Sequence, residues 1–217
     1  MVTARAALKR LQAGNLRFVE NVRGADAFLH TRRPALTTEQ QPVAIILGCS
    51  DARVPAEIVF DQGLGDLFVI RVAGNIVAPS QVGSVEFAAA RFGTPLVVVL
   101  GHTQCGAILA TLEEIRRRTA QSSNLRSIVE RIRPSVETVM ASGETDENRL
   151  VRQAVRANVR ASADHLRHGS PVLEQLIQEG RLLVVGAEYS LETGEVDFFD
   201  GIVDPGSGDS SDPDTGA

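Results

Sequence analysis

Four short runs of apolar residues, separated by longer amphipathic segments, constrain the fold of this chain more than any other feature. They lie at residues 43–47, 67–72, 96–100 and 182–187. Short, nearly continuous apolar runs are typical of strands buried on both faces of a parallel sheet. Segments with helical periodicity stand between the runs, and right-handed crossovers would then place the strands in one sheet. We therefore predict a single α/β domain with a central, mostly parallel four-stranded sheet flanked by helices.

The remaining segments surround this sheet. Residues 3–22 read as an amphipathic helix within an N-terminal arm (residues 1–35), which would pack on the chain's own core or on a partner subunit. Residues 123–142 and 147–168 predict helices on the outside of the sheet, and residues 195–199 a fifth strand at its edge. We place the domain at residues 1–203. Residues 204–217 are rich in Pro, Gly, Ser and Asp, so we expect a disordered acidic tail.

The charge and the apolar content exclude several classes of protein. The net charge is −5, but four aspartates and no basic residue lie in residues 201–217, so the rest carries about −1. A nucleic-acid-binding protein would need a clustered basic face. No stretch approaches the roughly 20 apolar residues of a membrane span, and the N-terminus lacks the apolar core of a signal peptide. Two cysteines without a secretion signal indicate a reducing compartment, so we expect a cytoplasmic protein.

Both cysteines of the chain and one of its four histidines lie in two short segments that come just after predicted strands. Cys49 comes after the first run, and His102 and Cys105 after the third. Ligands gather at the carboxyl ends of the strands in open parallel sheets. Two thiolates and an imidazole form a zinc-ligand set, and a catalytic zinc typically keeps a fourth position for water. The sequence therefore predicts a zinc site at this edge of the sheet.

Asp51 and Arg53 follow Cys49 closely and bear on that fourth position. In extended backbone they project to the same side, where Arg53 could pair with the carboxylate through two hydrogen bonds. Two thiolates already neutralise Zn²⁺, so a bound water should be acidified less than at a three-histidine site. We hypothesise that the Asp51–Arg53 pair acts as a gate: the carboxylate either stays with Arg53 or becomes the fourth zinc ligand.

Three other interpretations fit the same residues. Cys49, Asp51, His102 and Cys105 could together hold a structural zinc, which usually has four protein ligands. Cys49 could instead be a nucleophile with His102 as its base, although Cys105 would then have no role. Both cysteines could also be inert, because free cysteine is commonly buried.

Three segments of the chain resemble the β-class carbonic anhydrases of bacterial type, and the resemblance runs from about residue 11 to residue 199. The segments are CSDARVP (residues 49–55), GDLFVIR (residues 65–71) and GHTQCG (residues 101–106). The resemblance implies zinc held by Cys49, His102 and Cys105, and reversible hydration of CO2 to bicarbonate and a proton. It also implies that Asp51 and Arg53 form a catalytic dyad that orients the zinc-bound hydroxide or closes the site.

The resemblance also implies a substrate pocket and an assembly. Gln40 matches a glutamine that lines the pocket across a dimer interface, and Phe68 matches an apolar wall of that pocket. The family implies a homodimer or a dimer of dimers, with the N-terminal helix embracing the neighbouring subunit. Two rivals keep the fold but change the function: a non-catalytic zinc-stabilised scaffold, or a hydrolase of CS2 or COS.

Some members of the family bind bicarbonate at a second, allosteric site built from a tryptophan, an arginine and a tyrosine. Arg71 and Tyr189 match the arginine and the tyrosine. The tryptophan position is Ile46, and the chain contains no Trp. The resemblance therefore extends to only two of the three residues of that site.

Overall fold

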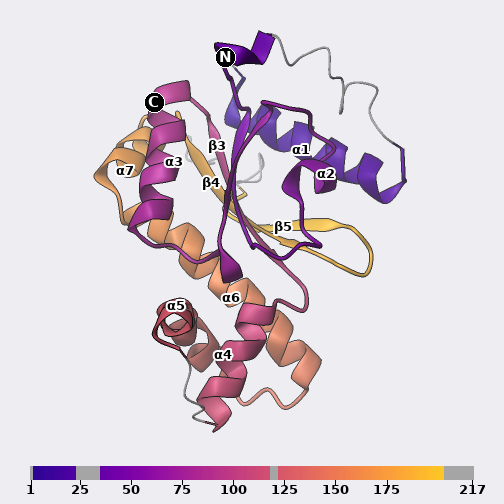
Figure 1. Cartoon of the computed structure of the whole chain (residues 1–217), viewed down its shortest axis with the longest axis vertical. Coiled ribbons are helices and arrows are strands. Elements are labelled where there is room, and N and C mark those ends of the chain that lie inside the picture. The colour runs from indigo at the N-terminus through magenta and orange to yellow at the C-terminus, as the bar shows by residue number, and fades with distance from the viewer. Residues whose placement is uncertain (1, 23–34, 118–121, 203–217) are drawn as a thin grey trace, which may run out of the picture.

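Five strands form one sheet in the order β2-β1-β3-β4-β5 in the computed structural model, which describes residues 2–22, 35–117 and 122–202 (Figure 1). The first four strands pair in parallel and β5 pairs antiparallel to β4. The predicted α/β fold is thus confirmed, and the fifth edge strand is present. The strands are β1 (Ala44–Gly48), β2 (Leu67–Arg71), β3 (Leu96–His102), β4 (Leu183–Tyr189) and β5 (Val196–Asp200).

Helices cover both faces of the sheet, because side chains of successive strand residues point to opposite faces. Ile46 packs on the face with α1 and α2, and Ile45 on the opposite face with α3, α6 and α7. The helices of these two faces are α1 (Ala4–Val19), α2 (Ala56–Val59), α3 (Pro79–Phe92), α6 (Glu147–His168) and α7 (Pro171–Gln178). Two 3-10 turns, η2 (Ala35–Thr37) and η3 (Ala73–Asn75), complete the connections.

A third cluster of apolar residues lies beyond the carboxyl ends of the strands. It joins α4 (Gly106–Arg117), α5 (Ser123–Met140) and the N-terminal part of α6. Cys49 and Cys105 belong to this cluster. The expectation that residues 123–142 flank the sheet is therefore wrong: α5 packs on α4 and α6, below the sheet in Figure 1. Its buried Ile132 and Val136 face these two helices because the sheet's own faces are already covered.

The N-terminal helix α1 lies on the chain's own sheet. Thr3 caps it by accepting a hydrogen bond from the backbone of Ala6, and Leu8 and Leu11 are buried against the strands. Asn15 donates to the carbonyls of Val59 and Gly194, at 3.1 and 2.9 Å. The arm was expected to pack on the chain's own core or on a partner subunit, and within the chain it packs on the core.

The fourth strand ends later than the apolar run predicts. The run ends at residue 187, but β4 continues to Tyr189, and Glu188 within it is buried. Arg156 of α6 neutralises this buried carboxylate at 2.7 Å, which makes a charged strand residue tolerable. Most of the predicted connection at residues 24–42 and all of the predicted tail lie outside the described residues.

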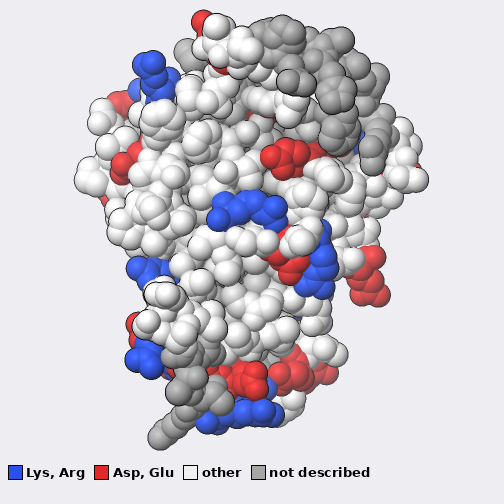
Figure 2. All heavy atoms as spheres, in the orientation of Figure 1, with Lys and Arg blue, Asp and Glu red and all other residues white. Residues whose placement is uncertain are grey.

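The described part of the chain has no helix that is long and apolar enough to cross a membrane. On the face shown in Figure 2, basic and acidic side chains are interspersed among uncharged ones. This face therefore lacks the continuous basic surface that a nucleic acid would require.

Candidate metal centre

Three elements bring the predicted ligands together. Cys49 directly follows β1, His102 is the last residue of β3, and Cys105 directly precedes α4. Because β1 and β3 are neighbours, with Gly48 opposite Leu100, the ends of the two strands meet at one edge. The two sulfurs and a ring nitrogen all lie within 4.8 Å of one another. One metal ion can therefore contact all three residues, which are 5% exposed or less.

The backbone fixes the orientation of the His102 ring. Its Nδ1 lies 2.9 Å from the carbonyl oxygen of Thr103, and a carbonyl can only accept, so Nδ1 carries the proton. Nε2 is buried and has no hydrogen-bond partner in the described structure. A metal-binding histidine typically donates its other N–H to such a carbonyl. Thr103 is itself held by β4, since its N–H donates to Tyr189 at 3.0 Å.

The two thiols share one proton. The hydrogen bond from Cys105, with that from the Gly74 backbone, outweighs burial and lowers the pKa of Cys49 to about 4. The same Cys49–Cys105 hydrogen bond, together with burial, raises the pKa of Cys105. Cys49 is thus a thiolate before any metal binds, and Cys105 must lose its proton when one does.

Asp51 lies beside this cluster and is paired with Arg53. Arg53 donates from Nε to Oδ1 at 2.9 Å and from Nη2 to Oδ2 at 2.7 Å, and its backbone N–H also reaches Oδ1. These hydrogen bonds hold the pKa of Asp51 well below its usual range. Oδ2 lies 3.9 Å from His102 Nε2, so one carboxylate oxygen borders the ligand cluster while Arg53 occupies both oxygens.

Arg71 and Tyr189, the two residues matched to an allosteric site, are not brought together. Arg71 donates to the carbonyls of Cys49 and Asp51, at 3.0 and 2.5 Å. Tyr189 lies on β4, and β1 and β3 separate the two strands. Burial raises the pKa of Tyr189. Within one chain, Arg71 therefore supports the backbone of the Cys49–Asp51 segment.

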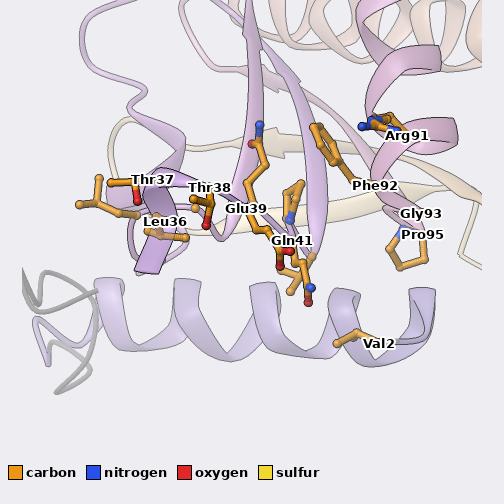
Figure 3. A pocket seen from close by; sticks show the side chains of 15 residues that line it. Val2, Leu36, Thr37, Thr38, Glu39, Gln41, Arg91, Phe92, Gly93 and Pro95 are labelled. Atoms are coloured by element: carbon orange, nitrogen blue, oxygen red, sulfur yellow. The ribbon is translucent and has the colours of Figure 1, made fainter. Parts of the chain in front are cut away.

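Gln40 and Phe68 also lie away from the ligand cluster of their own chain. Gln40 lies ahead of β1, whose five residues separate it from Cys49; at about 3.3 Å per residue this strand is about 17 Å long. Gln40 lines a groove of about 1570 Å³ beside α1, at the amino-terminal ends of the strands and so at the other end of the sheet from the ligand cluster. Figure 3 labels its neighbours Glu39 and Gln41. Phe68 packs against Phe87 and Phe92 of α3.

Gly74 is a member of the site that the sequence reasoning missed. It was expected only to end the second strand, yet its backbone N–H donates to the Cys49 sulfur at 3.3 Å. Gly74 has a left-handed φ of 69°, and a Cβ there would lie 2.7 Å from Ile132 Cδ1. A backbone donor has no side-chain signature, so only the Gly-Asn pair after the strand could have pointed to it.

The donor set fits zinc. Two sulfurs and an imidazole nitrogen are ligands that zinc prefers, and three protein ligands are typical of a catalytic site. The buried, unpartnered Nε2 of His102 supports this assignment, because an unpaired buried polar atom is otherwise costly. Inert packing of the two cysteines does not account for that nitrogen.

Comparison with known proteins gives one consistent result. A family model described as carbonic anhydrase matches residues 44–196. Carbonic anhydrase 2 of Mycobacterium tuberculosis (strain CDC 1551 / Oshkosh) is 39% identical over 197 residues, which cover 91% of this chain and 93% of that protein.

Two solved structures show the same fold. A tetrameric β-carbonic anhydrase from Sordaria macrospora has a TM-score of 0.71 at 24% identity, over 78% of this chain and 86% of that one. A Coccomyxa β-carbonic anhydrase in complex with acetazolamide has a TM-score of 0.69 at 26% identity, over 77% and 76%.

Proposed function

The chain belongs to the β-class carbonic anhydrases, and from this premise we propose that it hydrates CO2 reversibly to bicarbonate and a proton with zinc held by Cys49, His102 and Cys105. The observation that carries the proposal is the buried cluster of these three side chains, with His102 Nε2 unpartnered. Bound there, zinc supplies the Lewis-acid chemistry that turns water into a nucleophile near neutral pH.

Asp51 serves this reaction as a fixed hydrogen-bond acceptor. Because Arg53 holds its pKa low, the carboxylate stays ionised and can only accept. Oδ2, at 3.9 Å from His102 Nε2, borders the cluster, where it could accept a hydrogen bond from the attacking oxygen and so orient a lone pair of that oxygen toward CO2. Arg53 holds the carboxylate in this position.

The same pair can also close the site. If the carboxylate leaves Arg53 and turns toward the ligand cluster, it takes the position that the nucleophile needs. Two charge-assisted hydrogen bonds oppose this movement. The Arg53 side chain is 56% exposed, so water weakens that opposition. Arg53 thereby sets the balance between the open and the closed arrangement.

A second copy of the chain would complete the substrate pocket. Gln40 and Phe68 lie away from the ligand cluster of their own chain, so we assign them to the site of the neighbouring subunit. β2 is one of the two edge strands of the described sheet, and beside it Phe87, whose ring centroid lies 6.3 Å from that of Phe68 on β2, is 54% exposed. An open strand edge beside exposed aromatic surface favours pairing with another copy. We infer a homodimer, alone or as half of a dimer of dimers.

Both cysteines are free, which fits the reducing environment of the cytoplasm, and we infer that location. For Arg71 we propose support of the Cys49–Asp51 backbone. An additional role in bicarbonate binding would require Arg71 to leave both carbonyls.

Stopped-flow measurement of CO2 hydration, with zinc-loaded and chelator-stripped protein, tests the proposed function. We expect a rate that depends on the metal. If the zinc-loaded protein hydrated no CO2 at any pH up to about 9, the chain would be interpreted as a non-catalytic, zinc-stabilised scaffold and not as an enzyme. Turnover of COS and CS2 by the same samples distinguishes CO2 from its two relatives as the substrate.

A further inference from the structure

The turn between β2 and α3 reaches the metal centre through its backbone. At this turn, η3, the Gly74 N–H donates to the Cys49 sulfur. Hydrogen bonds to a ligand sulfur withdraw electron density from it and so tune the metal that it binds. The position of this one N–H therefore affects how strongly Cys49 donates to the metal.

The turn itself is short and has an unusual backbone conformation. Gly74 and Asn75 both have left-handed backbone angles, with φ of 69° and 43°. Asparagine tolerates this region better than most residues other than glycine, and the Asn75 N–H closes the turn on the Val72 carbonyl at 3.0 Å. Contacts from outside the turn add to this local hydrogen bond.

Helix α6 supplies two contacts from outside the turn. Asn158 donates from Nδ2 to the Gly74 carbonyl at 2.8 Å, and Ser162, one helical turn later, donates to the Asn75 carbonyl at 3.1 Å. The two side chains are 2% and 6% exposed. In this buried setting water does not replace a lost partner readily, so each contact is a firm constraint.

The two contacts differ in their distance from the sulfur. Asn158 holds the carbonyl of Gly74, the residue that also supplies the N–H for Cys49. Ser162 holds the following residue. A change at Asn158 is therefore transmitted to the Cys49 hydrogen bond more directly than one at Ser162.

We propose that Asn158 is a positioning residue of the metal centre, which fixes the Gly74 N–H on the Cys49 sulfur and thereby the strength of that ligand. This inference rests on the proposed zinc site. It adds a side chain of α6, 109 positions after Cys49 in the chain, whose hydrogen bond goes to the Gly74 backbone.

The test compares three alanine variants of the full chain. Asn158→Ala removes the proposed contact, and Ser162→Ala is the matched control on the same helix and the same turn. Asn15→Ala is the control on another helix: Asn15 is a buried asparagine of α1 whose side chain donates to two backbone carbonyls, those of Val59 and Gly194. All three should lower thermal stability, so stability alone does not identify the positioning residue.

The decisive readouts are zinc affinity, measured by competition with a chelator, and an NMR coupling. When the protein is loaded with a spin-active cadmium isotope, the N–H···S bond should give a scalar coupling between the Gly74 amide proton and the metal. In Asn158→Ala we expect the coupling to be lost. Zinc affinity should fall by about 10-fold, because the sulfur is no longer held in place for the metal, and this loss outweighs the gain in electron density on the sulfur. In Asn15→Ala both should stay as in the unmodified chain, and in Ser162→Ala the coupling should persist.

An intact coupling and unchanged affinity in Asn158→Ala would overturn the proposal and leave Asn158 a purely structural residue. If this variant does not fold, Asn158→Leu keeps a side chain of similar size but has no donor, and the same two outcomes decide. Neither readout uses turnover. A chain that binds zinc as expected but does not hydrate CO2 would refute the proposed function and not this inference.

Discussion

Arg53 holds both carboxylate oxygens of Asp51, at 2.9 and 2.7 Å, while Asp51 Oδ2 lies 3.9 Å from Nε2 of His102. The carboxylate thus stands between a cation that keeps it ionised and the cluster that would hold the metal. Whether it stays with Arg53 or turns to the metal decides whether the fourth position is free. Asp51 is therefore as important to the proposed reaction as the three ligands.

Asp51→Ala should leave zinc bound but reduce CO2 hydration by about 100-fold, because the nucleophile would lose the acceptor that orients it. Metal content by atomic absorption and stopped-flow rates measure the two effects. Asp164→Ala, which removes an exposed carboxylate of α6, serves as the control. Full activity of Asp51→Ala would exclude Asp51 from the mechanism.

Arg53→Ala should shift the pH–rate profile to higher pH. The pKa of Asp51, held low by Arg53, would rise toward its ordinary value of about 3.9, which is still below neutral. The released carboxylate stays ionised and competes for the metal, so more hydroxide is needed to displace it. In the unmodified protein we expect the rate to rise between about pH 6.5 and about pH 8.5. Flat profiles for both proteins would indicate a site that is always open.

Zinc binding to the metal-free protein at pH 7 should release about one proton per site. With its pKa lowered to about 4, Cys49 is already a thiolate at this pH. Cys105, whose pKa is raised, still carries its proton and must give it up to bind the metal. A pH indicator in weak buffer counts the protons, and Mg²⁺ provides the blank because it does not favour thiolates. A second proton that appears only as the pH rises comes from the metal-bound water, whereas release of two protons that persists at about pH 6.5, below the rise of the rate, would mean that the thiols do not share one.

Gly74→Ala should destabilise the protein by about 2 kcal/mol or more, since a side chain would occupy a left-handed position and crowd the packed core. The added Cβ would lie 2.7 Å from Ile132 Cδ1 and 3.0 Å from Ala107 Cβ. The matched change Gly83→Ala places a Cβ inside α3 with nothing within 4 Å, and should stabilise by about 1 kcal/mol. Urea unfolding of both variants gives the comparison, and equal effects would show that position 74 is not constrained.

Subunit mixing tests whether Gln40 serves the neighbouring site. Gln40→Ala and Asp51→Ala should each be weakly active alone. If Gln40 acts across the interface, a mixed dimer contains one intact site, and random mixing should restore about a quarter of full activity. Each variant mixed with itself is the control. Failure of the mixture to recover, with exchange verified by mass spectrometry, would place Gln40 in its own chain's site or outside any site.

The ligand cluster was predictable because its geometry follows from a general property of parallel sheets. Cys49 and His102 directly follow apolar runs, and the carboxyl ends of neighbouring parallel strands meet at one edge. The Asp51–Arg53 pair was predictable because the residues are two apart in the chain and carry opposite charges. The extent of β4 was not, because a charged residue ends the apolar run, and Glu188 is paired between β3 and β5 and buried against Arg156 only in the folded chain.

Sequence alone therefore determined the fold class, the three candidate ligands and the local Asp51–Arg53 pair. Only the tertiary structure decided what supports them. The Gly74 N–H reaches Cys49 across 25 positions, and Asn158 reaches Gly74 across 84. One is a backbone donor that every residue except proline has, and the other is an asparagine on an otherwise ordinary helix. Their roles depend on how α6 and the turn after β2 pack around the ends of the strands, and such long-range packing leaves no local pattern in the chain.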